Sequence, residues 1–380
     1  MSMAADTLAG MTTIRAAVLE GVGGDLEVQE LDLAPPRTGE VQVRLLASGV
    51  CHSDLNAIDG TAETRCPAVL GHEGAGVVEA VGDGVTRVGV GQHVALSWAP
   101  SCGRCAECLD DLPHLCGTAW PMMAQGTLLD GTTRLSRGGE PVYHYSFISS
   151  FAERTVLPEA SCVPIPDDVP PEVAALVGCA VTTGICAVWR SAQVRAGQRA
   201  AVIGCGGVGL SAVMGLAAVG AAPIIAVDLH EGRLEAALSL GATDVVQAAA
   251  TAEETAERVR EASGGGVDVA IEATGRNDAM RAAFLSTRRR GTAVLIGIPA
   301  EDAVLELPAL SIPRMERRVM GALYGSARPE RDFVVILDQY ARGRLPLDRL
   351  ISHRLPLDQI GEAFDLLRSG SGRRIVLDLA

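Results

Sequence analysis

The chain has 380 residues, of which 48% are hydrophobic and 21% charged, as expected for a globular protein of two or three domains. This composition excludes a disordered chain, and the length excludes a small disulfide scaffold. The basic residues number 32, all of them Arg, against 46 acidic residues, so the net charge is −14. This charge disfavours nucleic acid and anionic membranes as partners, and the lack of Lys excludes Schiff-base chemistry.

Neither a targeting signal nor a membrane span is predicted. Residues 1–13 lack the basic start and apolar core of a signal peptide, so we expect a cytoplasmic protein. The stretch Leu210–Val227 is almost continuously apolar and approaches the length of a membrane span. Because Gly220 and Pro223 interrupt it and Asp228 ends it, we predict a buried helix, a turn and a buried strand.

Short β-like runs separated by turns characterise the chain as far as about Pro170. The predicted strands are Ile14–Leu19, Val41–Ala47, Gly76–Val81 and His93–Leu96. Proline pairs and glycine-rich segments between these runs indicate turns. This part of the sequence predicts a β-rich domain with long functional loops.

Buried strands alternate with helices after Pro170, starting with a helix predicted from Glu172 to about Ser191. The strands that follow are Ala200–Ile203, Ile224–Val227, Val267–Ile271 and Thr292–Ile296. The helices between them are Val208–Val219, Arg233–Leu240, Thr255–Ala262 and Met280–Ser286. This alternation predicts an α/β fold with a doubly wound parallel sheet. A last predicted strand, Arg374–Leu379, is expected to pair with the first domain, which makes that domain discontinuous.

A glycine-rich loop lies between the first strand and helix of this second part. The run Gly204-Cys205-Gly206-Gly207-Val208-Gly209 has the G-x-G-x-x-G spacing that lets a pyrophosphate approach a helix N-terminus. Asp228 ends the next strand, where its carboxylate is expected to accept hydrogen bonds from a ribose and to repel the 2′-phosphate of NADP. Arg233 is expected either to flank the adenosine ribose or to be a solvated helix arginine.

Four cysteines stand at metal-binding spacing in the run Cys102, Cys105, Cys108 and Cys116. Four thiolates close a tetrahedral site, which is typical of a structural zinc, although an iron–sulfur cluster accepts the same ligands. The polar loop Pro100–Pro113 around them is expected to be disordered without the metal.

A second candidate metal set is dispersed along the chain. Cys51 follows a predicted strand, His72 precedes another, and Cys179 lies in the predicted helix before the glycine loop. Two thiolates and one imidazole leave an open coordination position, as in a catalytic zinc site. The remaining cysteines, which are more typical of small core residues than of ligands, are Cys66, Cys162, Cys186 and Cys205.

In their order and spacing these motifs resemble those of the zinc-dependent medium-chain alcohol dehydrogenases, from about Ile14 to the C-terminus. The motifs are Cys51-His52-Ser53-Asp54, Gly71-His72-Glu73-Gly74-Ala75-Gly76, the four-cysteine lobe, Cys179 and the glycine loop. The chain is most similar to the longer liver-type and class III (glutathione-dependent formaldehyde) branches, which share the loop 130–144.

The resemblance implies a domain organisation as well as an activity. A GroES-like catalytic domain is expected over residues 1–180 together with 324–380, with the structural zinc lobe at about 100–117. A Rossmann NAD-binding domain is expected over residues 181–323, with the active site between the two domains. The family also implies assembly as a homodimer or homotetramer through the coenzyme domains.

The resemblance also assigns roles to residues, with two zinc ions per chain and NAD as cofactors. Cys51, His72 and Cys179 are implied ligands of catalytic zinc, and the four-cysteine lobe holds structural zinc. Asp54 is expected to orient His72, Glu73 to lie behind the catalytic zinc, and Ser53 to touch the substrate oxygen and pass its proton toward solvent. The implied contacts to NAD are His52 and Arg374 at the pyrophosphate and Thr183 and Ile298 at the nicotinamide, with a core role for Ile298 nearly as plausible.

Two departures from the family pattern bear on the substrate. Asn56 stands where liver-type enzymes carry a relay histidine, and Trp120 stands where the class III branch carries an arginine for a substrate carboxylate. Trp120 begins the apolar series Trp120-Pro121-Met122-Met123, and Tyr324 is a candidate second aromatic wall. We therefore predict an NAD-dependent oxidoreductase for apolar, allylic or aromatic primary alcohols.

Two other functions stay open at this stage. One is a thiol-adduct formaldehyde dehydrogenase of the glutathione or mycothiol type. The other is a zinc-ribbon protein that binds a partner through the four-cysteine lobe. The net charge and the dispersed set Cys51, His72 and Cys179 argue against the zinc-ribbon protein.

Overall fold

The computed structural model describes residues 10–370 and 372–380 and divides into two compact units. Of residues 1–13, for which no signal peptide was predicted, residues 1–9 lie outside the described residues. Unit 1 comprises residues 1–179, 328–337 and 351–380, and unit 2 comprises residues 180–327 and 338–350. Residues 338–350 therefore group with the sheet of unit 2, whereas the sequence prediction assigned everything after residue 323 to the first domain.

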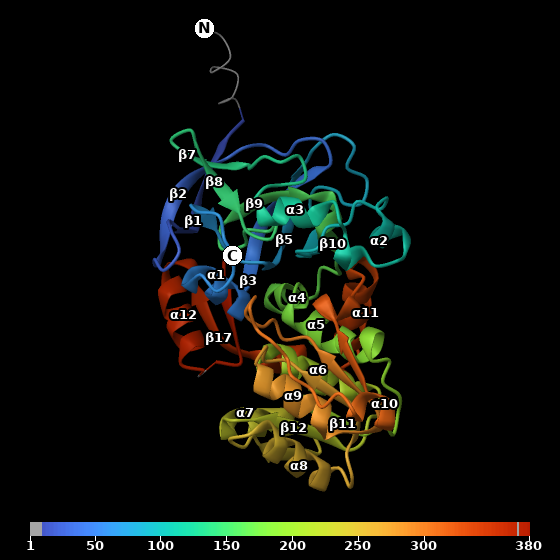
Figure 1. The fold of residues 1–380 in the computed structure, drawn as a ribbon. Coiled ribbons are helices and arrows are strands. Elements are labelled where there is room, and N and C mark those ends of the chain that lie inside the picture. Colours follow the sequence, from blue (N-terminus) through green and yellow to red (C-terminus); the bar gives the residue numbers. More distant parts are fainter. Residues whose placement is uncertain (1–9, 371) are drawn as a thin grey trace. The chain divides into compact units, whose positions relative to one another are not determined.

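Unit 1 is rich in β-structure, as predicted, and contains a barrel and an open sheet (Figure 1). The closed barrel has the strand order β1 (Thr12–Leu19), β2 (Leu26–Leu33), β7 (Leu135–Arg137), β8 (Glu140–His144) and β4 (Ala68–Val69). The sheet has the order β10 (Cys162–Pro164), β6 (His93–Leu96), β5 (Glu73–Val81), β3 (Glu40–Val50), β18 (Arg374–Asp378) and β17 (Ile351–Pro356), with β9 (Arg154–Pro158) also paired to β3. Its helices are α1 (His52–Asp59), α2 (Ala106–Leu109), α3 (Ala119–Ala124), α4 (Pro171–Val177) and α12 (Ile360–Arg368).

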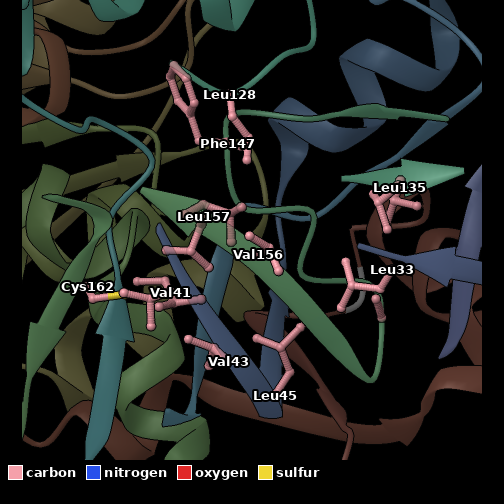
Figure 2. Packing of buried hydrophobic residues seen from close by; sticks show 14 of the residues in the cluster. Leu33, Val41, Val43, Leu45, Leu128, Leu135, Phe147, Val156, Leu157 and Cys162 are labelled. Atoms are coloured by element: carbon pink, nitrogen blue, oxygen red, sulfur yellow. The ribbon is translucent and has the colours of Figure 1, made fainter. Parts of the chain in front are cut away.

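The C-terminal strand β18 pairs antiparallel with β3 and parallel with β17. The expectation that the last segment returns to the first domain is therefore confirmed. The core of unit 1 forms where inward-facing residues of these strands meet. Figure 2 shows Val41, Val43 and Leu45 of β3 beside Val156 and Leu157 of β9, all of them fully buried. Alternate residues of a strand share one face, so this packing sets the register on which the site below depends.

The loop 130–144, which the longer branches of the resembled family share, folds as the hairpin β7–β8 around a buried arginine. Arg134 is 1% exposed, and its guanidinium donates to Glu40 Oε2 at 2.8 Å and to Asp130 Oδ2 at 2.6 Å. Its backbone N–H donates to His144 Nε2 at 3.2 Å. Burial and the Arg134 charge lower the pKa of His144 to about 3, so the ring accepts this bond in its neutral form at pH 7.

Unit 2 contains a six-stranded sheet in which every pairing is parallel. The strand order is β13 (Asp244–Gln247), β12 (Ile224–Asp228), β11 (Ala200–Ile203), β14 (Val267–Glu272), β15 (Thr287–Leu295) and β16 (Arg318–Gly321). The main helices of the unit are α5 (Ala180–Cys186), α6 (Gly207–Ala218), α7 (Glu231–Ser239), α8 (Ala252–Ala262), α9 (Asn277–Ser286) and α10 (Ser311–Met315) (Figure 1). In sequence order this is 3-2-1-4-5-6, which confirms the predicted Rossmann sheet and puts its ligand crevice beyond the carboxyl ends of the strands. Helix α11 (Pro329–Ala341) contributes residues to both units.

Two sequence expectations about long apolar helices have different outcomes. The stretch Leu210–Val227 folds as the end of α6, a turn and β12, as predicted. The single helix predicted from Glu172 to about Ser191 is wrong, because the chain breaks at Gly178 and Cys179 between α4 and α5. No single described helix is long and apolar enough to cross a membrane, and one bent pair, Pro171–Val177 with Ala180–Ser191, meets the length and composition criteria.

Candidate functional site

The four cysteines of the lobe converge in unit 1. The Sγ atoms of Cys102, Cys105, Cys108 and Cys116 all lie within 4.8 Å of one another. Cys105 Sγ and Cys116 Sγ are 3.8 Å apart, and two thiolates bound to tetrahedral zinc at 2.3 Å also lie about 3.8 Å apart. The donor set and its spacing therefore fit a closed zinc site.

Hydrogen bonds donated to two of these sulfur atoms stabilise their thiolate forms. Backbone N–H groups donate from Cys102 to Cys116 Sγ and from Cys105 to Cys102 Sγ, both at 3.3 Å. The Thr118 hydroxyl donates to Cys102 Sγ at 3.3 Å and is the main reason why the pKa of Cys102 falls to about 6. A thiolate is the form that binds metal, so Cys102 favours the ligand form before any ion binds. Burial raises the pKa of Cys108 to about 12, so a metal has to displace the proton of that thiol.

The pairing of two strands brings together the first two members of the dispersed set. Strand β3 ends one residue before Cys51, and β5 begins one residue after His72. In the antiparallel pair β3–β5, Gly49 lies opposite Glu73, so Cys51 and His72 leave the sheet at the same edge. A Cβ on Gly49 would lie 2.1 Å from Glu73 Oε2, so glycine leaves the space that this carboxylate fills.

A break in the helical segment carries the third member to the same edge. A Cβ on Gly178 would lie 2.7 Å from the carbonyl oxygen of Leu96 and 3.4 Å from Glu73 Cα. This close approach is open only to glycine, and it explains why the predicted continuous helix ends before Cys179. Ligand atoms of Cys51, His72, Glu73 and Cys179 all lie within 4.8 Å of one another.

Asp54 organises this second cluster from a position with no solvent exposure. Its Oδ1 lies 3.0 Å from His72 Nδ1 and accepts the Gly71 N–H at 3.1 Å, while Oδ2 accepts the Cys51 N–H at 3.1 Å. A carboxylate on Nδ1 fixes the orientation of the imidazole and leaves Nε2 for a metal. A hydrogen bond from Cys179 lowers the pKa of Cys51 well below its ordinary value, so the cluster contains a ready thiolate.

Glu73 is held by a buried arginine from the other end of the chain. Glu73 is fully buried, and its carboxylate forms an ion pair with the guanidinium of Arg374, which is 6% exposed. Burial raises the pKa of Glu73 to about 7 even though Arg374 opposes this shift. With Glu73 engaged in this way, Cys51, His72 and Cys179 form a three-ligand set, which fits a zinc site with one open position.

Unit 2 contains a separate candidate site at its glycine loop. A Cβ on Gly209 would lie 1.7 Å from the carbonyl oxygen of Gly204, and Gly204 itself has a φ of 93°. Both glycines are therefore required by the turn itself. A Cβ on Gly206 would meet nothing within 4 Å, so the protein leaves open space next to the N-terminus of α6, where a pyrophosphate fits.

A pocket of about 200 Å³ continues from this loop across the ends of β11 and β12. Asp228 lines it and is 7% exposed, with Oδ2 accepting the Cys205 N–H at 2.8 Å and Oδ1 accepting the His230 N–H at 3.0 Å. Arg233 lies on the same wall, with Nη1 3.9 Å from Asp228 Oδ2. A carboxylate has about four lone-pair positions, so Asp228 retains acceptors for a ribose.

The remaining predicted contacts to NAD and substrate lie in both units. In unit 1 His52 is exposed at the start of α1, and Ser53 is partly buried with Oγ 3.9 Å from Cys51 Sγ. In unit 2 Thr183 is 8% exposed in α5, and Ile298 is 65% exposed after β15. Their predicted roles stay predictions, as does the pyrophosphate contact of Arg374, whose guanidinium here pairs with Glu73.

The two predicted aromatic walls have different surroundings. Trp120 is 38% exposed in α3, and its ring meets that of Trp98 edge to face, with centroids 6.5 Å apart. Tyr324 is only 2% exposed and lies within unit 2. This burial favours a role as a core residue over a role as a second aromatic wall of the substrate pocket.

Sequence reasoning missed two residues, Trp98 and Tyr145, and one pairing that the structure links to these clusters. Trp98 meets Trp120 edge to face, Tyr145 contacts both His72 and Ser53, and the pair of Arg374 with Glu73 joins residues 301 positions apart. The position of Trp98 just before the four-cysteine run was a usable signal. Tyr145 has no motif around it.

Comparison with known proteins identifies the family of the chain. Residues 37–167 match the family model of the alcohol dehydrogenase GroES-like domain, and residues 207–341 match that of the zinc-binding dehydrogenase. A zinc-binding-domain alcohol dehydrogenase from Burkholderia ambifaria is 35% identical over 97% of this chain and 100% of its own, with a TM-score of 0.93. Benzyl alcohol dehydrogenase from Acinetobacter calcoaceticus is 32% identical over 97% of this chain and 100% of its own, with a TM-score of 0.92.

A more distant structure shares the fold. It is an alcohol dehydrogenase from Escherichia coli CFT073 in complex with NADH, 24% identical over 97% of this chain and 99% of its own, with a TM-score of 0.79. The family matches confirm the GroES-like and Rossmann-like parts of the predicted fold, and zinc and NAD are the cofactors that the donor sets and the glycine loop fit. The chain therefore belongs to the zinc-binding medium-chain alcohol dehydrogenase family and is a zinc-dependent, alcohol dehydrogenase-like oxidoreductase.

Proposed function

We propose that this enzyme interconverts a primary alcohol and its aldehyde with NAD, using one zinc ion at Cys51, His72 and Cys179 and a second at the four-cysteine lobe. The observation that carries this proposal is the convergence of those three donors beside the Ser53 hydroxyl. When bound, zinc supplies a Lewis acid that acidifies the alcohol, and NAD supplies the hydride acceptor.

The chain's own residues position the substrate and handle its proton. The Ser53 hydroxyl, next to Cys51, accepts the alcohol proton and passes it toward solvent. Asn56 lies partly buried three residues after Ser53 on the same helix, and its neutral amide does not titrate as a histidine would. Asp54 keeps the His72 ring in one orientation, and the ion pair of Glu73 with Arg374 keeps a second carboxylate from occupying the open position.

Arg374 has a second potential use in binding NAD. Its Nε is buried without a hydrogen-bond partner in the part of the chain that the structure describes. A buried donor without a partner is costly, and a phosphate oxygen is a strong acceptor for it. This supports the proposed contact between Arg374 and the pyrophosphate.

We further propose an aromatic or allylic primary alcohol as the substrate. Leu96, which packs against Gly74 and Gly178 at the metal cluster, is two residues from Trp98, and Trp98 pairs with Trp120. Two indole rings present the apolar, polarizable surface that an aromatic ring prefers. A relative that is 32% identical is a benzyl alcohol dehydrogenase, which supports the same class of substrate.

The alternative substrate, a hydroxymethyl adduct of glutathione or mycothiol, is less well supported. Carboxylates of a thiol adduct require a cation in the site. Arg134, the cation nearest in sequence after Trp120, is buried in ion pairs with Glu40 and Asp130. The loop 130–144 that carries Arg134 nevertheless supports a place for this chain near the longer branches of the family.

A Trp120→Ala variant tests the proposed substrate class. Loss of the ring that meets Trp98 is expected to lower kcat/KM for benzyl alcohol about tenfold, since an aromatic pair contributes roughly 0.5–1.5 kcal/mol beyond area burial. For ethanol, which is too small to use the indole surface, we expect less than about a twofold change. Steady-state kinetics with both alcohols and NAD measure this ratio. A wild-type enzyme that oxidised hydroxymethylglutathione better than any free alcohol would contradict the proposal.

We also propose that the enzyme is a cytoplasmic homo-oligomer that pairs through unit 2. Strand β16 is hydrogen-bonded to β15 on one side and has no partner strand on the other among the described residues. Val319 on this strand and Leu310 and Ile312 before it are 38%, 67% and 42% exposed. Open strand edges with apolar neighbours favour pairing with a second copy. Light scattering is expected to give at least twice the mass of the chain, and a monomeric mass would rule the pairing out.

A further inference from the structure

The segment Tyr145–Phe151 combines deep burial with an unfavourable backbone. Ser146, Phe147 and Ser149 have φ angles of 50°, 64° and 50°, in the left-handed region that residues with a Cβ rarely adopt. From Phe147 onward every residue of the segment is at most 1% exposed. Backbone of this kind persists only where the surrounding structure holds it, and it clusters at functional sites.

Two backbone hydrogen bonds hold this segment on the loop that carries His72. The Ser150 N–H donates to the Gly71 carbonyl and the Phe151 N–H to the Leu70 carbonyl, both at 3.0 Å. Gly71 has a φ of 88°, and a Cβ there would lie 2.6 Å from both Ser150 Oγ and Phe151 Cδ1. The strained segment and the metal-binding loop therefore fit together without room for a side chain between them.

Tyr145 begins the segment and contacts two functional residues at once. Its hydroxyl donates to the backbone carbonyl of Ser53 at 3.0 Å. Its ring meets the His72 ring edge to face, with centroids 5.8 Å apart and an interplanar angle of 66°. The strained Ser149 fixes the Tyr145 backbone in return, since the Tyr145 N–H donates to Ser149 Oγ at 3.1 Å and the Ser149 N–H donates to the Tyr145 carbonyl at 3.2 Å.

We propose that Tyr145 is a positioning residue with two separable tasks. Its hydroxyl holds the Ser53 carbonyl and thereby the direction of the Ser53 hydroxyl. Its ring packs edge to face against the His72 imidazole, which Asp54 holds at Nδ1, and so further restricts that ring. The first task rests on the proposed function of Ser53 as the group that takes the alcohol proton. The second needs only that His72 binds a metal.

A Tyr145→Phe variant of the zinc-loaded enzyme tests the first task. This change removes the bond to the Ser53 carbonyl and keeps the ring against His72. We expect kcat for the alcohol to fall about tenfold with KM nearly unchanged, because misplacing a reacting group by 1 Å can cost about a hundredfold in rate. Zinc content and melting temperature are expected to match those of the wild type.

Tyr143→Phe is the matched control for this variant. Tyr143 lies two residues earlier, and its ring stacks under the guanidinium of Arg65 at 4.1 Å, in contact with neither Ser53 nor His72. The control loses the same hydroxyl oxygen at a position two residues away, outside the proposed catalytic contacts, so we expect its kcat to stay within about twofold of the wild type.

A Tyr145→Leu variant tests the second task without any substrate. With the ring gone, His72 has more freedom, and zinc is expected to leave the catalytic cluster about tenfold faster in the presence of a chelator, in line with the effect of other groups that orient ligands. Release from the four-cysteine lobe serves as the internal reference and is expected to stay unchanged. The release is followed with a colorimetric zinc indicator in the absence of alcohol and NAD.

Three outcomes would overturn the inference. The first is a Tyr145→Phe variant as active as Tyr143→Phe, and the second is a Tyr145→Leu variant that releases zinc like the wild type. The third is a Tyr145→Phe variant in which kcat, zinc content and melting temperature all fall and KM rises, which marks a purely structural role. If Tyr145→Leu does not fold, Tyr145→Met, which also lacks the ring, takes its place in the zinc-release experiment, and Tyr145→Phe still decides the first task. If the wild type oxidises no alcohol, the proposed function fails, while the zinc-release experiment still tests the ring.

Discussion

A Cys179→Ser variant is expected to lose turnover by about a thousandfold or more while staying folded. Cys179 supplies one of three ligands to the proposed catalytic zinc. Zinc is expected to contribute several kcal/mol to stabilising the developing charge, at about 1.4 kcal/mol for each tenfold in rate. NADH binding, measured by fluorescence titration, is expected to persist, because the glycine loop and the Asp228 pocket belong to unit 2.

Cys105→Ser is expected to lose stability and to keep turnover, the opposite of Cys179→Ser. It removes one of four ligands of the lobe, where metal binding supplies local folding free energy, so the melting temperature should fall by roughly 5–10 °C. The folded fraction is expected to keep most of its turnover. Cys66→Ser is the matched control, because Cys66 belongs to neither ligand set.

Zinc analysis completes this comparison. The wild type and the Cys66→Ser control are expected to hold two zinc ions per chain and each ligand variant about one. A single zinc in the wild type, bound by the lobe alone, would contradict a catalytic zinc and favour the zinc-ribbon interaction protein. Equal stability loss with retained turnover in both ligand variants would show that the two roles are wrongly assigned.

Substitution of Asp228 is expected to weaken the preference for NAD strongly. The Asp228 carboxylate is fixed by the N–H groups of Cys205 and His230, so it cannot turn away from a 2′-phosphate. Two like charges at about 5 Å repel by roughly 3 kcal/mol at an effective dielectric of 20, which predicts at least a hundredfold preference for NAD in kcat/KM. Asp228→Ser is expected to raise KM for NAD and to improve the use of NADP at least tenfold.

Asp228→Asn separates charge from hydrogen bonding. The amide keeps one acceptor and the shape of the side chain, so use of NADP should improve while KM for NAD rises less than in Asp228→Ser. Glu231→Gln is the matched control, since it removes an equal charge from an exposed position three residues later and should change neither ratio. A wild-type enzyme that used both dinucleotides equally well would contradict the assignment of Asp228.

Part of the site could be predicted because its residues lie close together in the sequence. The four-cysteine lobe spans only residues 102–116, and the glycine loop joins a strand to the next helix. Asp54 reaches His72 as the sequence predicted. The sequence analysis named none of the strands β2, β4, β7, β8, β9, β10, β13, β16 and β17. Most of these are short or partly exposed and lack the hydrophobic runs that signal a strand.

Tertiary structure decided what depends on contacts between distant segments. The sequence by itself indicated the fold class and the two groups of side chains that the structure brings together, because the spacing of the cysteines and glycines and the order of the family's motifs carry them. It did not indicate that Arg374 pairs with Glu73 across 301 positions, that the chain breaks at Gly178 to deliver Cys179, or that Tyr145 holds both Ser53 and His72. The physical reason is that close backbone approach and left-handed backbone at Ser146, Phe147 and Ser149 are imposed by packing around a residue and not by its own preference.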